Sequence, residues 1–127
     1  MDKKDILLID DDEDIREYIK IILKKEGFGI RAASGGKEGM EAIIKKKPDL
    51  IIMDVMMSDM SEGFDLAGEL KKDARFSGIP IIILTALELL TDFDDKRRFR
   101  DWLPGDAYME KPFKKDELIK KIKELIL

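Results

Sequence analysis

The chain has 127 residues, of which 44% are hydrophobic and 41% are charged, and 24 basic against 28 acidic side chains give a formal net charge of −4. This length and balance are typical of one globular domain and exclude a disordered or membrane-spanning chain. The absence of cysteine and histidine excludes disulfide scaffolds, thiol and Ser-His-Asp catalysis, zinc sites built on these residues, and a phosphohistidine on this chain.

The first predicted elements are a strand and an amphipathic helix. Residues 6–9 form a continuous apolar run that favours a strand buried on both faces, and aspartates follow it directly. Residues 15–23 then place apolar side chains on one stripe at helical spacing. Gly27 lies just past this predicted helix, where a left-handed cap is common.

This pattern of strand and helix repeats along the rest of the chain. A second strand is expected over residues 29–33, and Ser34 is the predicted N-cap of a helix that Pro48 terminates. Further strands are predicted over residues 50–54, 79–85 and 107–110, and further helices over residues 64–72, 87–103 and 116–126. The alternation predicts an α/β fold, a doubly wound (βα)5 domain whose five-stranded parallel sheet has helices on both faces. We expect one domain over residues 1–127.

Side chains at the carboxyl ends of the strands are the candidates for function, because ligands bind there in doubly wound sheets. The first strand ends at Asp10 and Asp11, the third at Asp54 and the fourth at Thr85, and Lys111 follows the fifth. Neighbouring carboxylates raise one another's pKa unless a cation intervenes, and Mg²⁺ with a lysine suits a set of oxygen ligands. An aspartate beside Mg²⁺ can attack phosphorus and form an acyl phosphate.

Four segments resemble the receiver domain of two-component response regulators. They are residues 6–12 (ILLIDDD), 48–57 (PDLIIMDVMM), 79–86 (IPIIILTA) and 111–113 (KPF). They occur in the family's order and near its spacing, and the match covers nearly the whole chain. The resemblance implies the flavodoxin-like strand order 2-1-3-4-5. It also implies that the chain takes a phosphoryl group from a histidine kinase or a histidine-containing phosphotransfer protein.

The resemblance assigns a role to each matched residue. Asp54 would be the phosphoacceptor. Mg²⁺ would be held by Asp10, Asp11, Asp54 and the backbone carbonyl of Met56. Lys111 would bind the phosphoryl oxygens, which places a positive charge where negative charge develops during transfer. Under this assignment the chain is no general enzyme, because it catalyses only its own phosphorylation and dephosphorylation.

The resemblance also implies a switch and the partners that read it. Thr85 and Tyr108 would be the switch pair, with Thr85 moving toward the phosphoryl group while the Tyr108 ring turns inward. The bond between Lys111 and Pro112 would be cis. The switch would change a face that binds a downstream protein in the cytoplasm. A sequence pI of about 5.0 argues against direct binding of nucleic acid, and no membrane partner is expected.

Three departures from the family pattern concern loops. Ser58 stands where family members usually have proline, and the glycine that usually follows comes one residue later, at Gly63. The 26-residue step from Thr85 to Lys111 is longer than usual. The usual Gly-Ala before the last strand is replaced by residues 103–106 (LPGD). We place Tyr108 by its spacing from Lys111.

Two positions bear on the lifetime of the phosphorylated state. Met56 and Leu87 lie two residues after Asp54 and Thr85, where family members place side chains that flank the phosphoryl group. Neither side chain can orient water by a hydrogen bond, so slow self-dephosphorylation is predicted. The measurement that checks this is the decay of the phosphorylated mass in the wild type and in variants with polar residues at both positions. A wild-type lifetime no longer than theirs would contradict it.

Three alternatives stay open at this point. The chain could be a receiver-like interaction module that acts without phosphorylation, which the altered loops favour and the intact set of aspartates, Thr85 and Lys111 argues against. It could be a receiver excised from a longer regulator or hybrid kinase. A metal-dependent phosphatase with an aspartate nucleophile needs a second acid two residues after the nucleophile, where Met56 stands instead. The sequence leaves the cognate kinase and the oligomeric state undetermined.

Overall fold

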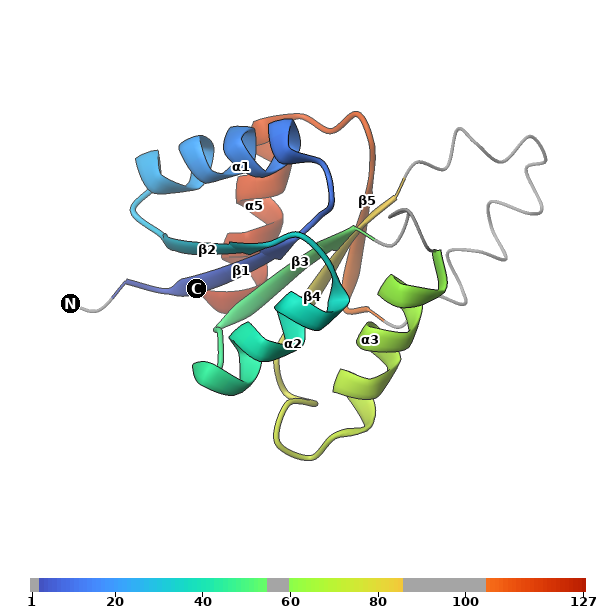
Figure 1. Ribbon diagram of the computed structural model, residues 1–127. Helices are drawn as coiled ribbons and strands as arrows, with labels where there is room; N and C mark the ends of the chain where they lie inside the picture. The colour runs from blue at the N-terminus through green and yellow to red at the C-terminus, as the bar shows by residue number, and fades with distance from the viewer. Residues whose placement is uncertain (1–2, 55–59, 86–104) are drawn as a thin grey trace.

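Five parallel strands form the central sheet of the computed structural model, which describes residues 3–54, 60–85 and 105–127. The strands are β1 (Asp5–Ile9), β2 (Gly29–Ala33), β3 (Leu50–Asp54), β4 (Ile81–Thr85) and β5 (Ala107–Glu110). They pair in the order β2-β1-β3-β4-β5, and every pair is parallel (Figure 1). The predicted doubly wound α/β fold and its strand order are therefore confirmed.

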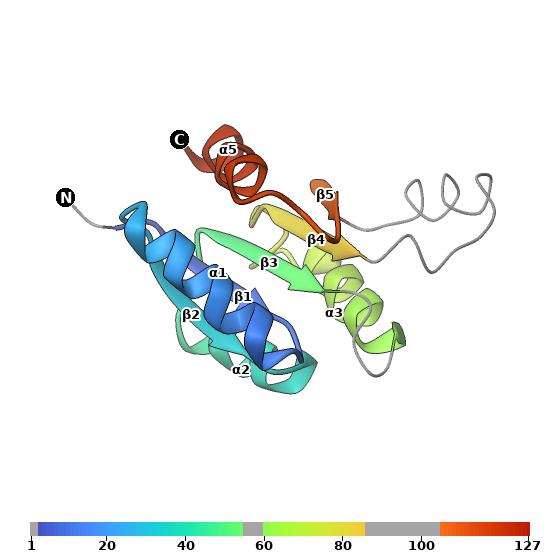
Figure 2. The same ribbon diagram turned by 90° about the horizontal axis from the view of Figure 1, so that it is seen from above.

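Helices cover both faces of this sheet. The described helices are α1 (Glu13–Lys25), α2 (Gly36–Lys45), α3 (Met60–Lys72) and α5 (Lys115–Ile126). α1 and α5 lie on one face, and α2 and α3 lie on the other (Figure 2). The helix predicted over residues 87–103 lies outside the described residues. Within the described ranges, none of the helices has the length and apolar character needed to span a membrane.

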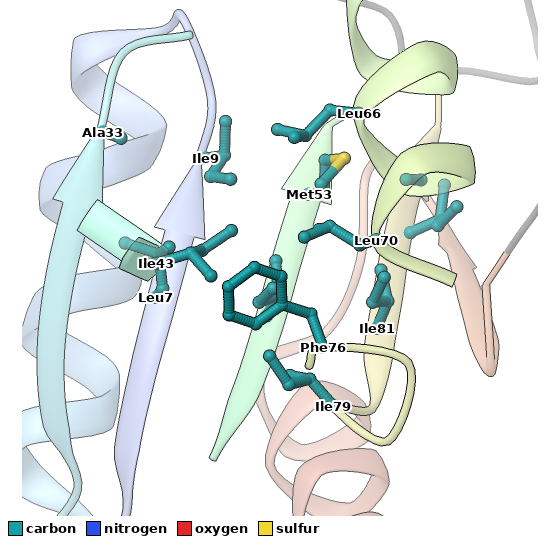
Figure 3. Packing of buried hydrophobic residues seen from close by; sticks show 13 residues of the cluster. Leu7, Ile9, Ala33, Ile43, Met53, Leu66, Leu70, Phe76, Ile79 and Ile81 are labelled. Carbon is teal, nitrogen blue, oxygen red and sulfur yellow. The ribbon is translucent and has the colours of Figure 1, made fainter. Parts of the chain in front are cut away.

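Each strand buries both of its faces, which accounts for the continuous apolar runs in the sequence. In β1, Leu7 and Ile9 face the cluster under α2 and α3, while Ile6 and Leu8 face the cluster under α1 and α5. In the first cluster, Phe76 from the loop after α3 packs among the strand and helix side chains (Figure 3). Each fully buried leucine or isoleucine contributes about 1.5–3 kcal/mol, so these two clusters hold the strand ends in place.

The start of α2 corrects one prediction. Gly35, in extended conformation, is the N-cap of this helix, and the prediction of Ser34 was wrong by one residue. The Ser34 hydroxyl instead donates to Glu38 Oε2 at 2.6 Å, and the Ser34 N–H donates to the same oxygen at 3.0 Å. The Glu38 carboxylate, from inside α2, therefore accepts both the N–H and the hydroxyl of Ser34 in the preceding loop.

The bounds of several further elements differ from the predictions by a few residues. α3 begins at Met60 rather than at residue 64, and α5 begins at Lys115 rather than Asp116. β4 begins at Ile81 because the Ile79 N–H donates to Phe76 in the preceding turn. The left-handed glycine predicted after α1 is confirmed, since Gly27 has φ of 89°.

Candidate functional site

The carboxyl ends of β1 and β3 bring three aspartates together. Asp10 and Asp11 directly follow β1, and Asp54 is the last residue of β3. The two strands pair Ile9 with Met53, so the residues that follow on each strand lie side by side. One carboxylate oxygen of each aspartate lies within 4.8 Å of the other two. Asp10 is fully buried, Asp54 is 3% exposed, and Asp11 is exposed.

Lys111 reaches this group from the end of β5. Its Nζ donates to Asp10 Oδ2 at 3.2 Å and to Asp54 Oδ2 at 3.0 Å. The lysine side chain is 17% exposed, so the ion pairs are largely shielded from water. The peptide bond between Lys111 and Pro112 is cis. Lys111 thus joins two acids that lie far from it in the sequence, Asp54 at 57 residues and Asp10 at 101 residues.

The backbone around Asp10 fixes the direction of its carboxylate. Its Oδ1 accepts the Asp12 N–H at 2.9 Å, and its own N–H donates to Ala33 in β2 at 3.1 Å. Asp12 in turn is the N-cap of α1, where its Oδ1 accepts from Asp14 and Ile15 at 2.9 and 3.3 Å. A carboxylate at this position complements the positive end of the helix dipole. The acidic loop is therefore held by strand and helix together.

The electrostatics of the site are unbalanced. Burial raises the pKa of Asp10, and the Asp54 charge raises it further, while the Asp12 N–H and Lys111 act in the opposite direction. Burial alone would lower the pKa of Lys111, but the Asp54 and Asp10 charges and hydrogen bonds more than compensate, so this pKa is raised. Asp10 and Asp54 share one ammonium group, and Asp11 adds a third carboxylate beside them. An excess of negative charge on oxygen ligands fits a hard divalent cation such as Mg²⁺.

The remaining predicted site residues divide between the described and undescribed parts of the chain. The backbone of Thr85 ends β4 and pairs with Glu110, the neighbour of Lys111. Tyr108 lies in β5, is 38% exposed and pairs with Ile83. The predictions for Met56, for Leu87 and for much of the 58–63 loop fall outside the described residues.

Asp12 and Arg16 contact the site although no role was predicted for them from the sequence. Both contact Asp10, since the Asp12 N–H donates to its carboxylate and Arg16 Nη1 donates to its carbonyl oxygen at 2.8 Å. The signal for Asp12 was its place just before the first helical turn, which favours an N-cap. For Arg16 the sequence holds no comparable signal, because its contact depends on the direction in which α1 leaves the strand.

A comparison with protein-family models matches residues 6–123 to the response regulator receiver domain. The chain belongs to the response regulator receiver family. This receiver is 37% identical over 123 residues to the transcriptional regulatory protein GltR of Pseudomonas aeruginosa, covering 97% of this chain and 49% of that protein. It is 36% identical to the phosphate regulon transcriptional regulatory protein PhoB of the same organism, covering 97% and 52%. The receiver thus spans about half the length of these curated relatives.

Solved structures agree with this assignment. The receiver matches the signal receiver domain of a histidine kinase from Syntrophus aciditrophicus with a TM-score of 0.85 and 32% identity, covering 97% of this chain and 89% of that one. A putative response regulator from Chloroflexus aurantiacus matches with a TM-score of 0.84 and 27% identity, covering 98% of each chain. The family resemblance read from the four sequence segments is confirmed.

Proposed function

We propose that this receiver accepts a phosphoryl group on Asp54 from a phosphohistidine on a partner protein. The supporting observation is the position of Asp54, whose nearly buried carboxylate lies beside Asp10 and Asp11 and accepts a hydrogen bond from Lys111. The ammonium group of Lys111 and the neighbouring carboxylates place this acid where a phosphoryl group and a cation could be held together. This geometry and membership of the family together support the roles given to these residues.

The proposed transfer is balanced in bonds and charge. A carboxylate oxygen of Asp54 forms a bond to phosphorus, the bond from phosphorus to the histidine nitrogen breaks, and its electron pair stays on that nitrogen. Lys111 then moves its hydrogen bond onto a phosphoryl oxygen, where it stabilises the charge. Mg²⁺, held by Asp10, Asp11, Asp54 and the Met56 carbonyl, supplies further neutralisation of the transferring oxygens when bound.

The output of the transfer is a change in protein binding. Thr85 and Tyr108 form the switch pair, and the packing around β4 and β5 is the element with two arrangements. We propose that residues 1–127 form one receiver domain in the cytoplasm whose output comes from a protein surface or domain outside these residues. GltR and PhoB are named as transcriptional regulators, so regulation of transcription through such a partner is one downstream role.

The test is the intact mass of the protein after incubation with Mg²⁺ and acetyl phosphate. One added phosphoryl group is expected in the wild type and in Asp116→Asn, a matched change at an exposed position in α5. The adduct is expected to vanish in Asp54→Asn and in the wild type when metal is removed. An adduct that persists in Asp54→Asn would overturn the assignment of the acceptor. No wild-type adduct with either acetyl phosphate or a phosphohistidine protein would favour the interaction module.

A further inference from the structure

Arg16 holds the acidic loop of the site from the first turns of α1. Its Nη1 donates to the carbonyl oxygen of Asp10 at 2.8 Å, and its backbone N–H donates to the carbonyl of Asp12 at 3.0 Å. The arginine side chain is half-buried. The side chain therefore bonds to the carbonyl of Asp10, while the backbone N–H makes the i→i−4 bond that starts the helix at its N-cap.

The bond to the carbonyl of Asp10 matters because the same residue is fixed on three more sides. Its N–H is bonded to Ala33, its Oδ1 to the Asp12 N–H and its Oδ2 to Lys111. With these groups held, the carbonyl determines how the next peptide turns, and that peptide carries Asp11. A guanidinium group suits this task, because its planar donors are fixed in direction and it stays protonated.

We infer that Arg16 is a positioning residue for the metal site, holding the Asp10–Asp12 backbone so that the three carboxylates converge. The inference rests on the proposed function, since it takes Asp10, Asp11 and Asp54 as metal ligands. Arg16 acts through the backbone of a ligand residue. Partners that orient metal ligands typically contribute about 10–100-fold to affinity.

Three competing roles for the arginine predict outcomes that differ from the one expected here. If only its charge mattered, its removal would leave the carboxylates more negative and would tighten binding of a divalent cation. If it only stabilised α1, its removal would weaken the fold and leave the affinity of the folded protein unchanged. Glu38 lies close enough that the Arg16 charge contributes to lowering its pKa, after the larger effect of the Ser34 hydrogen bonds. Surface pairing with Glu38 would also leave the metal affinity unchanged.

The experiment measures Mn²⁺ binding by the electron paramagnetic resonance of the free ion, because Mn²⁺ takes the oxygen ligands of Mg²⁺ sites. Arg16→Met keeps the aliphatic packing and removes the donor and charge. Lys20→Met is the matched control, one helical turn further along α1, where its ammonium pairs with Glu17 at 3.5 Å. The dissociation constant is expected to rise roughly tenfold in Arg16→Met and to change less than about twofold in the control.

A second readout needs no metal. Hydrogen exchange of the Asp12 amide, which donates to Asp10 Oδ1, is expected to speed up in Arg16→Met, while exchange of Ile19 in the middle of α1 stays unchanged. If Arg16→Met does not fold, Arg16→Leu, which has good helix propensity and no donor, carries the same two expectations. Unchanged or tighter Mn²⁺ binding in a folded variant would overturn the inference alone. Failure of the wild type to bind Mn²⁺ would overturn the proposed function and the inference with it.

Discussion

The two ends of strand β1 carry ionic clusters that are built differently. At its amino end, Asp5 pairs with Arg31 of β2, with Nη2 and Oδ2 2.6 Å apart and Nε 3.1–3.2 Å from both carboxylate oxygens. Just past its carboxyl end, Asp10 shares Lys111 with Asp54. Asp5 is 9% exposed and Asp10 is fully buried, so both clusters hold an acid in the interior.

The cluster at the amino end is balanced and saturated. Arg31 gives Asp5 a bidentate partner, and its remaining donors reach the carbonyl oxygens of Ala42 and Lys46 at 2.9 and 2.7 Å. One guanidinium thereby joins β1, β2 and the end of α2. A planar group with several donors in a fixed plane is well suited to such a joint. The Asp5 N–H also donates to Asp49 Oδ2 at 2.7 Å, so a second acid borders the cluster. The ion pair itself joins one acid to one base, and a structural role accounts for it.

At the carboxyl end, Asp10 and Asp54 share Lys111, and Asp11 adds a third carboxylate, so the carboxylates outnumber the ammonium group that pairs with them. A group that served only the fold would gain by reducing the negative charge here, because burying a carboxylate costs free energy even when it is paired. The imbalance is therefore a mark of function, as perturbed charges often are.

The largest expected effect comes from removing the base of the unbalanced cluster. Lys111→Met should lower the rate of phosphorylation by acetyl phosphate about 10²–10³-fold, because the donor that stabilises charge on the phosphoryl oxygens is lost. The rate is followed by intact mass at saturating Mg²⁺. Lys114→Met is the control, since that exposed lysine makes no side-chain capping bond at the start of α5. A loss of less than tenfold would show that Lys111 has a structural role only.

Removing the base of the balanced cluster should change stability and leave the chemistry intact. Arg31→Met leaves the Asp5 carboxylate without its partner, which should lower the free energy of unfolding by about 3 kcal/mol. Urea denaturation measures this loss, and the phosphorylation rate well below the unfolding midpoint should match the wild type. Arg75→Met breaks a surface pair with Asp73 and a contact with the Phe76 ring, and should lower the free energy of unfolding by no more than about 1 kcal/mol. A reduced phosphorylation rate in folded Arg31→Met would contradict the claim that the Asp5–Arg31 pair serves the fold and not the phosphorylation site.

Of the two ionic clusters, the sequence predicted only the one at the carboxyl end of β1. Apolar runs followed by Asp10 and Asp54 predicted which strands end at the site, because period and composition determine which strands are buried on both faces. The pair between Asp5 and Arg31 was missed, because it depends on the register that sets Asp5 beside Gly29 and brings Arg31 across the strands. Register and the direction of α1 are tertiary properties, and the Arg16 contact was missed for the same reason.

The bounds of the helices show the same limit on a smaller scale. Ser34 has the side chain of a common N-cap, yet its hydroxyl is bonded to Glu38 and the backbone of Gly35 begins α2. Local preference identified the loop and missed the residue, because the Ser34 hydroxyl bonds the Glu38 side chain and not a backbone N–H of the first turn. The chemistry at Asp54, Thr85 and Lys111 could be inferred only from several strand ends taken together.

A smaller effect is expected from reducing the charge of the unbalanced cluster. Without metal at pH 7, Asp10→Asn should raise the free energy of unfolding by about 1 kcal/mol, because it removes a buried charge that function requires and the fold does not. The pKa of Asp10 is raised in the folded state, so its ionised form costs stability above the unfolded value of 3.8. The difference in free energy of unfolding between Asp10→Asn and the wild type should shrink as the pH falls through the folded pKa of Asp10, and it should vanish below 3.8.

That experiment compares urea denaturation of the two proteins across pH in the presence of a chelator. The difference between them isolates Asp10, because the remaining carboxylates titrate in both. Asp116→Asn controls for a general loss of one charge and should follow the wild type. If metal-free Asp10→Asn is less stable than the wild type at pH 7, the Asp10 carboxylate stabilises the fold, as the Asp5 carboxylate does at the other end of β1.

The smallest effect is expected when both partners of the balanced cluster are replaced together. Asp5→Leu combined with Arg31→Met should bring the free energy of unfolding back to within about 1 kcal/mol of the wild type, since apolar groups can replace a buried ion pair at little net cost. The carbonyl oxygens freed at Ala42 and Lys46 lie near the end of α2, where water can replace the guanidinium. The double-mutant cycle, measured by urea denaturation, should give a coupling of several kcal/mol. A double variant as unstable as Arg31→Met would mean that the joint between β1, β2 and α2, rather than the pairing of Asp5, is what the arginine supplies.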